Sequence, residues 1–424
     1  MSENFLLFVV ALMGIVVCLG FFNEKVTGLT YEISLMLFSV VIGIAVFGVL
    51  FLTNRDTFRY LMNDLQILHL DSFLMEGVLC FMLFAGSCHI RLDDFRTNAR
   101  AVGVLSVLGT FLGAVLFGLF FYLCVSLTGV RLPLPVCLLF GSIVSPTDPI
   151  AATSILNKFG LPEKTGFIIE GESLLNDGVG VALFVCFSNM VEAAGGGNFF
   201  SVMLRELFGA VAVGAVVTWL CFRIFLRTED PVRQIFCSIL AVSLSYVICE
   251  KLDFSGAIAS VVCGVLFSSF ITAEEERGRV WDLDLYEHFW TVTDTLLNSV
   301  LYVMLGLTFM HLFQMEQVII LSLAAIAGNL IGRAGSVGIS SLLIDPIPDG
   351  FSRWEFTKLL TWGGLRGGLC IALAMSTATL LGDEVYHIVL GGAYAIVFFT
   401  TVVQGLTMKR FYEKMRPSSA EADA

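Results

Sequence analysis

Thirteen apolar runs, each close to the length needed to cross a bilayer as a helix, follow one another along the chain. Hydrophobic residues make up 57% of the sequence and charged residues only 14%, whereas about a quarter of a typical soluble domain is charged. We therefore predict an all-α polytopic membrane protein, with a transmembrane domain over residues 1–408 and a short tail over 409–424. The runs lie near 5–22, 31–52, 73–88, 101–127, 135–157, 166–191, 202–225, 234–250, 254–272, 295–313, 317–343, 356–380 and 386–408.

The distribution of basic residues predicts how these spans are oriented. Thirteen is an odd number, so the two termini are expected on opposite sides of the membrane. Seventeen of the 24 Lys and Arg residues fall in the tail and in the loops on its side, against five on the N-terminal side. Because bases accumulate on the cytoplasmic side, we expect a cytoplasmic C-terminus and an external N-terminus, in the inner or plasma membrane.

Charge and cysteine usage exclude several other classes of protein. The net charge of −12 argues against nucleic acid as a partner. The 11 cysteines fall almost entirely inside apolar runs, without a Cys-x-x-Cys pair. Such cysteines behave as small buried hydrophobic residues, so we expect no disulfide framework, no resident metal centre and no cofactor.

Two groups of three spans, over about 101–191 and 317–408, form an expected inverted-topology repeat. They are offset by seven spans, an odd number, so corresponding spans run in opposite directions. The middle span of each group, the fifth and the twelfth, is interrupted by Pro146 and Pro149 in one case and by the glycine pairs 363–364 and 367–368 in the other. Proline breaks a helix, and broken backbone at membrane depth is buried or lines a wet cavity. We therefore expect an ion site where these two spans cross.

Two aspartates, Asp148 and Asp177, lie where a span has its middle. Ionisable groups are costly at this depth and are usually kept for ion or proton handling. Asp148 sits in the break of the fifth span beside Thr147, and both supply oxygen ligands for a hard cation. On the sixth span, Asp177 shares a helix face with Glu170 and Ser173 and lies about 16 Å from the cytoplasmic end, near the midplane.

Asp177 is the primary carboxylate of the predicted site, and Asn176 beside it is a neutral neighbour. A carboxylate at this depth has two favourable partners, because desolvation favours its protonated form and a bound cation favours its ionised form. Competition between a proton and a cation for this one group is already a mechanism of exchange.

Arg333 and Arg366 are the two bases that fall inside predicted spans. A lone buried guanidinium is too costly, so each needs an acidic or carbonyl partner. We pair Arg333 with Glu172, the acidic residue of the sixth span that points away from Asp177, as a structural ion pair. Arg366, in the interrupted twelfth span, has two possible roles: it offsets the free carbonyl ends or holds Asp148 ionised.

The tenth span offers weaker candidates. Asn298 is a candidate for a hydrogen bond across helices, whereas Asp294 lies close to the end of the span and is expected to be solvated. Neither is assigned to the predicted site.

Two motifs make a known family recognisable. Thr147-Asp148-Pro149, followed by Gly-Glu-Ser-Leu-Leu-Asn-Asp over 171–177, resembles the signature of NhaP-type sodium/proton antiporters, which animal sodium/hydrogen exchangers share more distantly. The run Gly-Leu-Arg-Gly over 364–367 and the membrane Arg333 resemble later motifs of the family. The resemblance extends over almost the whole chain, because the number of spans and the order of motifs also match.

The resemblance implies an exchanger of one monovalent cation, Na+ or Li+, for one proton, working as a homodimer by elevator-like alternating access. In the family, an Asn-Asp pair such as Asn176-Asp177 goes with electroneutral exchange. One departure is the third span, where many members carry an acidic residue and this chain has Leu83-Phe84-Ala85. The resemblance further implies a bridge from Glu172 to Arg333 and a cation held by Thr147, Asp148, Ser173 and Asp177.

Three other functions remain open from the residues alone. The ligand types do not separate Na+ from K+, so K+/H+ or mixed-cation exchange is the first alternative. Asp148 and Asp177 could form the dyad of an intramembrane aspartyl protease if their carboxyls shared a proton at close range, although we expect a transporter and not an enzyme. A channel would show conductance instead of tight one-to-one counterflow.

Overall fold

The structure, a computed structural model, describes residues 3–27, 30–53, 78–88, 92–148, 160–192, 199–279, 283–309 and 317–415, and within these ranges its regular elements are all helical. Short π-helical turns join α6 to α7 and α18 to α19, so each pair continues as one segment. The α-helices are α1 Glu3–Phe22, α2 Tyr31–Thr53, α5 Leu79–Ser87, α6 Leu92–Gly103, α7 Thr110–Thr128, α8 Leu134–Val144, α10 Glu163–Glu192, α11 Phe199–Phe225, α12 Pro231–Lys251, α13 Gly256–Glu276, α14 Asp284–Thr308, α15 Val318–Ser341, α16 Arg353–Trp362, α17 Gly368–Ser376, α18 Asp383–Phe398 and α19 Gly405–Met415.

Within the described ranges, the predicted apolar runs coincide with helices, except at the interruptions of the fifth and twelfth runs. Eight of the helical segments in the described ranges are long and apolar enough, by length and composition, to cross a membrane. This confirms the all-α polytopic fold, whereas the count of thirteen spans stays a prediction. The start of the third run and the second half of the fifth, with Pro149, lie outside the described residues.

Two helices extend well beyond the expected ends of their spans. The segment expected over 295–313 is α14, which begins at Asp284, with Asp284 and Glu287 in its first turn, where negative charge stabilises a helix. The segment expected to end at 408 continues through α19 to Met415, so the first part of the predicted tail is helical. Tyr412 is buried there, and its hydroxyl donates to the Gly160 carbonyl at 3.4 Å.

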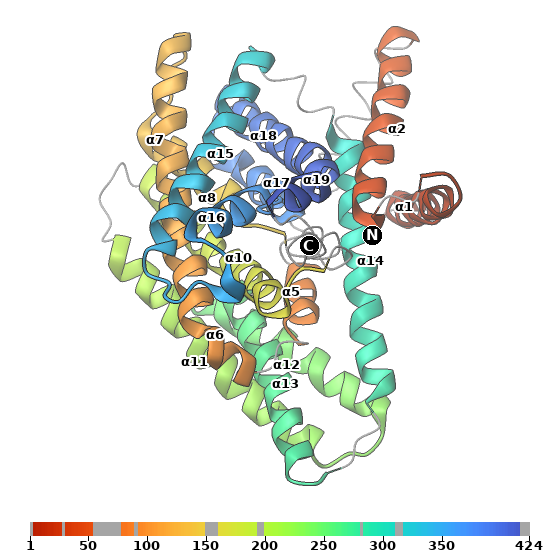
Figure 1. The fold of residues 1–424 in the computed structure, drawn as a ribbon. Coiled ribbons are helices and arrows are strands. Elements are labelled where there is room, and N and C mark those ends of the chain that lie inside the picture. The colour runs from red at the N-terminus through yellow and green to blue at the C-terminus, as the bar shows by residue number, and fades with distance from the viewer. Residues whose placement is uncertain are drawn as a thin grey trace, which may run out of the picture.

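The helices of the two predicted repeats pack against each other. The first is α7, α8 and α10, and the second is α15, α16 with α17, and α18. The α7 helix packs against both α8 and α15, while α17 packs against α8 and α18. Figure 1 shows α7, α15 and α18 gathered on one side of the molecule, and α14 with α1 and α2 on the other.

Close packing of α8 on α7 fixes the place where α8 ends. Phe140 of α8 meets Phe117 and Phe121 of α7 edge-on, with ring centroids 4.9 and 5.1 Å apart. At Gly141 the backbones approach so closely that a Cβ would lie 2.1 Å from the Ala114 carbonyl oxygen. Any larger residue there would push α8 outward and displace the polar segment that follows it.

Candidate functional site

Two helices break at the same place inside the molecule. The α8 helix ends at Val144 and continues as the non-helical segment 145–148, while α16 ends at Trp362 and α17 begins at Gly368. The two breaks are joined by a backbone hydrogen bond, in which the Asp148 amide donates to the Leu365 carbonyl at 2.8 Å. The expected crossing of two interrupted segments is therefore present.

Arg366 ties this crossing together. Its side chain is buried, and Nη1 donates to the carbonyl oxygen of Ser145 and, at 2.8 Å, to that of Pro146. Its Nε donates to Asn329 Oδ1 at 3.1 Å. Of the two roles that the sequence allows, these contacts fit the first, in which the guanidinium offsets carbonyls that the helix break leaves free.

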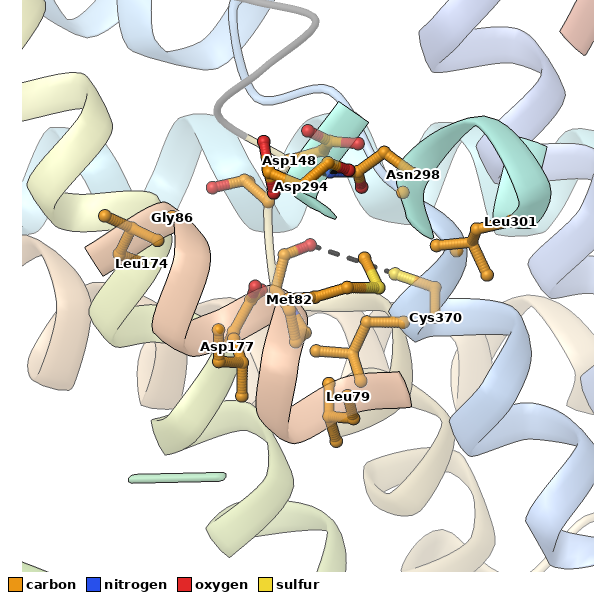
Figure 2. A pocket seen from close by; sticks show the side chains of 16 residues that line it. Leu79, Met82, Gly86, Asp148, Leu174, Asp177, Asp294, Asn298, Leu301 and Cys370 are labelled. Atoms are coloured by element: carbon orange, nitrogen blue, oxygen red, sulfur yellow. Dashed lines mark hydrogen bonds between the residues drawn. The ribbon is translucent and has the colours of Figure 1, made fainter. Parts of the chain in front are cut away.

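A cavity of about 70 Å³ lies beside the crossing. Thr147, Asp148 and Asp177 contribute to its wall, together with Gly367 from the second break. The α5 helix closes another side with Leu79, Met82, Leu83 and Gly86, none of which has a side-chain oxygen. Figure 2 shows Asp148 at the top of this cavity and Asp177 lower down, on the far side of Met82.

Thr147 is held in the cavity wall by two residues of α10. Its hydroxyl lies 2.8 Å from the Ser173 hydroxyl and accepts from Asn176 Nδ2 at 2.7 Å. Asn176 Oδ1 in turn accepts from the Thr147 amide at 3.1 Å. Ser173 and Asn176, which we expected among the cation-binding residues, are not part of the cavity wall, so they support Thr147 from behind.

Glu172 and Arg333 form a buried pair next to this group. Arg333 Nη1 and Nη2 donate to the two carboxylate oxygens of Glu172 at 2.6 and 2.8 Å. Arg333 Nε also donates to the Leu360 carbonyl at 3.2 Å, and Glu172 Oε1 accepts from Asn176 at 3.1 Å. The pair therefore links α10, α15 and α16 behind the cavity, with both charges satisfied by hydrogen bonds.

Residues of α14 that the sequence did not assign to the site contact it. The Tyr302 hydroxyl donates to Asp148 Oδ2. Asp294 and Asn298 line the same cavity. The α14 helix begins eleven residues earlier than expected, so Asp294 lies inside the helix and is half-buried, and the expectation that it is solvated stays a prediction. Asn298 bonds within its own helix, to Asp294, and the bond across helices comes from Tyr302. In the sequence, the four-residue spacing of Asp294, Asn298 and Tyr302 already indicates that the three side chains share one face of a helix.

The chemistry of the cavity suits a small hard cation. Its polar side chains offer oxygen from carboxylates, a hydroxyl and an amide, and hard cations prefer oxygen ligands. Within the described ranges, no three or more His, Cys, Asp or Glu side chains gather around one metal position.

Comparisons with known proteins place this geometry in context. The model of the sodium/hydrogen exchanger transmembrane family matches residues 7–414. The chain is 27% identical over 415 residues to the Na(+)/H(+) antiporter NhaP of Pseudomonas aeruginosa, covering 94% of each chain, and 30% identical over 332 residues to NhaH of Halobacillus aidingensis, covering 75% of this chain and 77% of that one. The fold matches the sodium proton antiporter MjNhaP1 of Methanocaldococcus jannaschii with a TM-score of 0.77 at 16% identity, covering 98% of this chain and all of the other.

Proposed function

Because the chain belongs to the sodium/hydrogen exchanger family, whose members are transporters and not enzymes, we propose that it is a Na+/H+ antiporter that exchanges one Na+ or Li+ for one proton. The relatives named above as Na+/H+ antiporters support the cation and the counter-ion. Exchange proceeds by alternating access, so that the same site faces each side of the membrane in turn.

The observation that carries the proposal is the pair of aspartates in one cavity at the crossing of two broken helices. Asp177 holds either a proton or the cation, because protonation removes the negative charge that attracts the cation and a bound cation favours the ionised carboxylate. Asp148 and Thr147 complete the oxygen ligands of the cation. Ser173 and Asn176 keep the Thr147 hydroxyl in place, and Ser173 reaches the cation only after a rearrangement of that contact.

The proposed arrangement in the membrane is supported by the loop charges. We place the C-terminus in the cytoplasm and the N-terminus outside, in the inner or plasma membrane, because 17 of 24 bases lie on the C-terminal side. Compartment-specific reporters fused to each terminus test this orientation. We also propose a homodimer, which chemical cross-linking in native membranes would reveal as a doubled mass.

K+/H+ exchange is the remaining alternative, because oxygen ligands alone do not select between alkali cations. An intramembrane protease loses its support, since the family is one of transporters and the Tyr302 hydroxyl occupies one oxygen of Asp148. A cation channel would carry current without proton counterflow.

Proteoliposomes loaded with a pH-sensitive dye test the proposal. In wild-type vesicles, we expect added Na+ or Li+ to move protons in the opposite direction, with no effect of membrane voltage. Asp177→Asn should abolish this movement, while Asp177→Glu keeps part of it. Retained exchange in Asp177→Asn would contradict the site, and proton movement driven by K+ but not by Na+ would favour the alternative.

A further inference from the structure

A row of polar side chains on α14 faces the ion cavity. Asp294, Asn298 and Tyr302 follow at four-residue intervals, so they lie on one side of the helix. Asp294 and Asn298 line the cavity, and Tyr302 bonds to Asp148. Figure 2 shows Asp294 and Asn298 beside Asp148 at the top of the cavity, with Asp177 lower down.

The carboxylate of Asp294 is held in a defined position. Asn298 Nδ2 donates to Asp294 Oδ1 at 2.9 Å and to the Asp294 carbonyl oxygen at 3.0 Å. Asn298 is buried, whereas Asp294 is half-buried and lines the cavity, so its carboxylate is accessible from the cavity. A carboxylate within a membrane-spanning helix is expensive, and local packing alone would be served equally well by an uncharged residue.

The wall of the cavity is unusually rich in negative charge. Among the described residues that line it are three carboxylates, those of Asp148, Asp177 and Asp294, and no Lys, Arg or His side chain. An excess of one sign in a cleft with low-dielectric walls concentrates ions of the opposite sign. Asp294 lies in this wall beside the pair Asp148 and Asp177, so its negative charge adds to theirs.

A second cavity, of about 260 Å³, lies at the start of the same helix, where Glu287 of α14 and Glu275 of α13 contribute to its wall. Glu287 precedes Asp294 by seven residues, or two turns, and therefore lies on the same side of α14. We call this second cavity the outer cavity and the cavity that contains Asp148 and Asp177 the inner cavity. Cys88, which directly follows α5, lines the outer cavity, while Gly86 of α5 lines the inner cavity. Both cavities therefore contact α5 and α14, one after the other along these helices. Along α14, Asp294 lies between Glu287 of the outer cavity and Tyr302.

We propose that Asp294, positioned by Asn298, captures the alkali cation as it passes from the outer cavity and delivers it to Asp148 and Asp177. This inference rests on the proposed function and adds to it a residue that sets the apparent affinity for the cation. Asp294 acts on binding and not on the exchange step, because the proton and the cation still compete at Asp177.

Asp294→Asn in proteoliposomes tests the proposal with little structural change. Asparagine keeps an oxygen that accepts from Asn298, so the substitution removes the charge alone. We expect the KM for Na+ to rise about tenfold, the size that one charge produces across a partly screened site, with Vmax within about twofold of wild type. Asp294→Glu should restore most of the affinity. Asp383→Asn, which removes an exposed charge from the first turn of α18 and lines neither cavity, is the control and should behave as wild type.

Each result separates this inference from the proposed function. If wild type and Asp294→Asn exchange Na+ with the same KM, or if the variant loses Vmax at an unchanged KM, the role of Asp294 is overturned and the proposed function stands. If the wild-type protein does not exchange Na+ for protons, the proposed function fails first. Should Asp294→Asn not fold, Asn298→Ala releases the carboxylate from its position, and an unchanged KM in that variant would reject the proposal.

Discussion

Thr147 shows how a single residue depends on its neighbours at this site. Its amide and hydroxyl are both bonded to Asn176, and the hydroxyl also meets Ser173. Because Asn176 is bonded in turn to Glu172, which is paired with Arg333, the ligand geometry is coupled to the buried ion pair. A change at the ion pair is therefore transmitted to the cavity wall through two hydrogen-bonded side chains.

Replacing Glu172 by Ala should lower stability much more than it alters the ion chemistry. The substitution leaves Arg333 buried without its carboxylate, and breaking a buried pair in this way costs about 3–5 kcal/mol. Thermal unfolding of the detergent-solubilised protein measures the loss. Glu192→Gln, an exposed acid at the end of the same helix, is the control and should leave the unfolding temperature unchanged.

The double variant Glu172→Leu with Arg333→Met separates charge from packing. Replacing both charges by apolar residues of similar size is often close to neutral, so we expect it to recover most of the lost stability. A Glu172→Ala variant with wild-type stability but no transport would contradict the structural role assigned to the pair.

At the scale of elements, the site depends on how closely the two broken helices approach. A Cβ on Gly367 would lie 2.6 Å from Asp148 Oδ2 and 3.0 Å from Asp148 Cβ. Asp148 has little freedom to retreat, because its amide is bonded to Leu365 and its carboxylate to Tyr302. Glycine is therefore required at this crossing for a reason of space and not of backbone conformation.

Gly367→Ala should reduce exchange at least about tenfold while the protein still folds, because misplacement of a reacting group by about 1 Å can cost a hundredfold in rate. Exchange in proteoliposomes and thermal unfolding, measured on the same preparation, give the two readouts. Gly103→Ala, on α6, has no atom within 4 Å of the added Cβ and is the matched control. Normal exchange in Gly367→Ala would show that the crossing tolerates an expansion that the geometry forbids.

Most helices and the crossing of the broken segments could be predicted from the sequence, because long apolar runs and Pro or Gly interruptions are local signals. The contribution of α14 to the wall of the cavity could not be predicted from the sequence. Hydropathy places the start of that span at 295, because the residues before it are rich in polar side chains. The helix begins at Asp284, however, so Asp294 lies inside it and not at its end. The bond from Tyr302 to Asp148 depends on tertiary packing across 154 residues, which no local pattern reports.

On the scale of the whole molecule, the cavity lies within a large helical body. The helices of the two repeats pack through α7 with α15 and through α8 with α17, so the cavity lies between segments that are distant in sequence. The α14 and α5 helices close the cavity from outside these repeats. If the helices of the two repeats moved relative to α5 and α14, Asp148 and Asp177 would move along the wall that α5 and α14 form. Alternating access needs a motion of this kind.

The central claim is that a proton and an alkali cation replace each other at Asp177. The most direct measurement is proton release on adding Na+ to the purified protein in weakly buffered solution, followed with a pH dye against an equal addition of choline chloride. We predict that Na+ releases protons with saturation, close to one per site, and that Asp177→Asn releases none. Saturable Na+ binding without proton release from the wild-type protein would contradict the account.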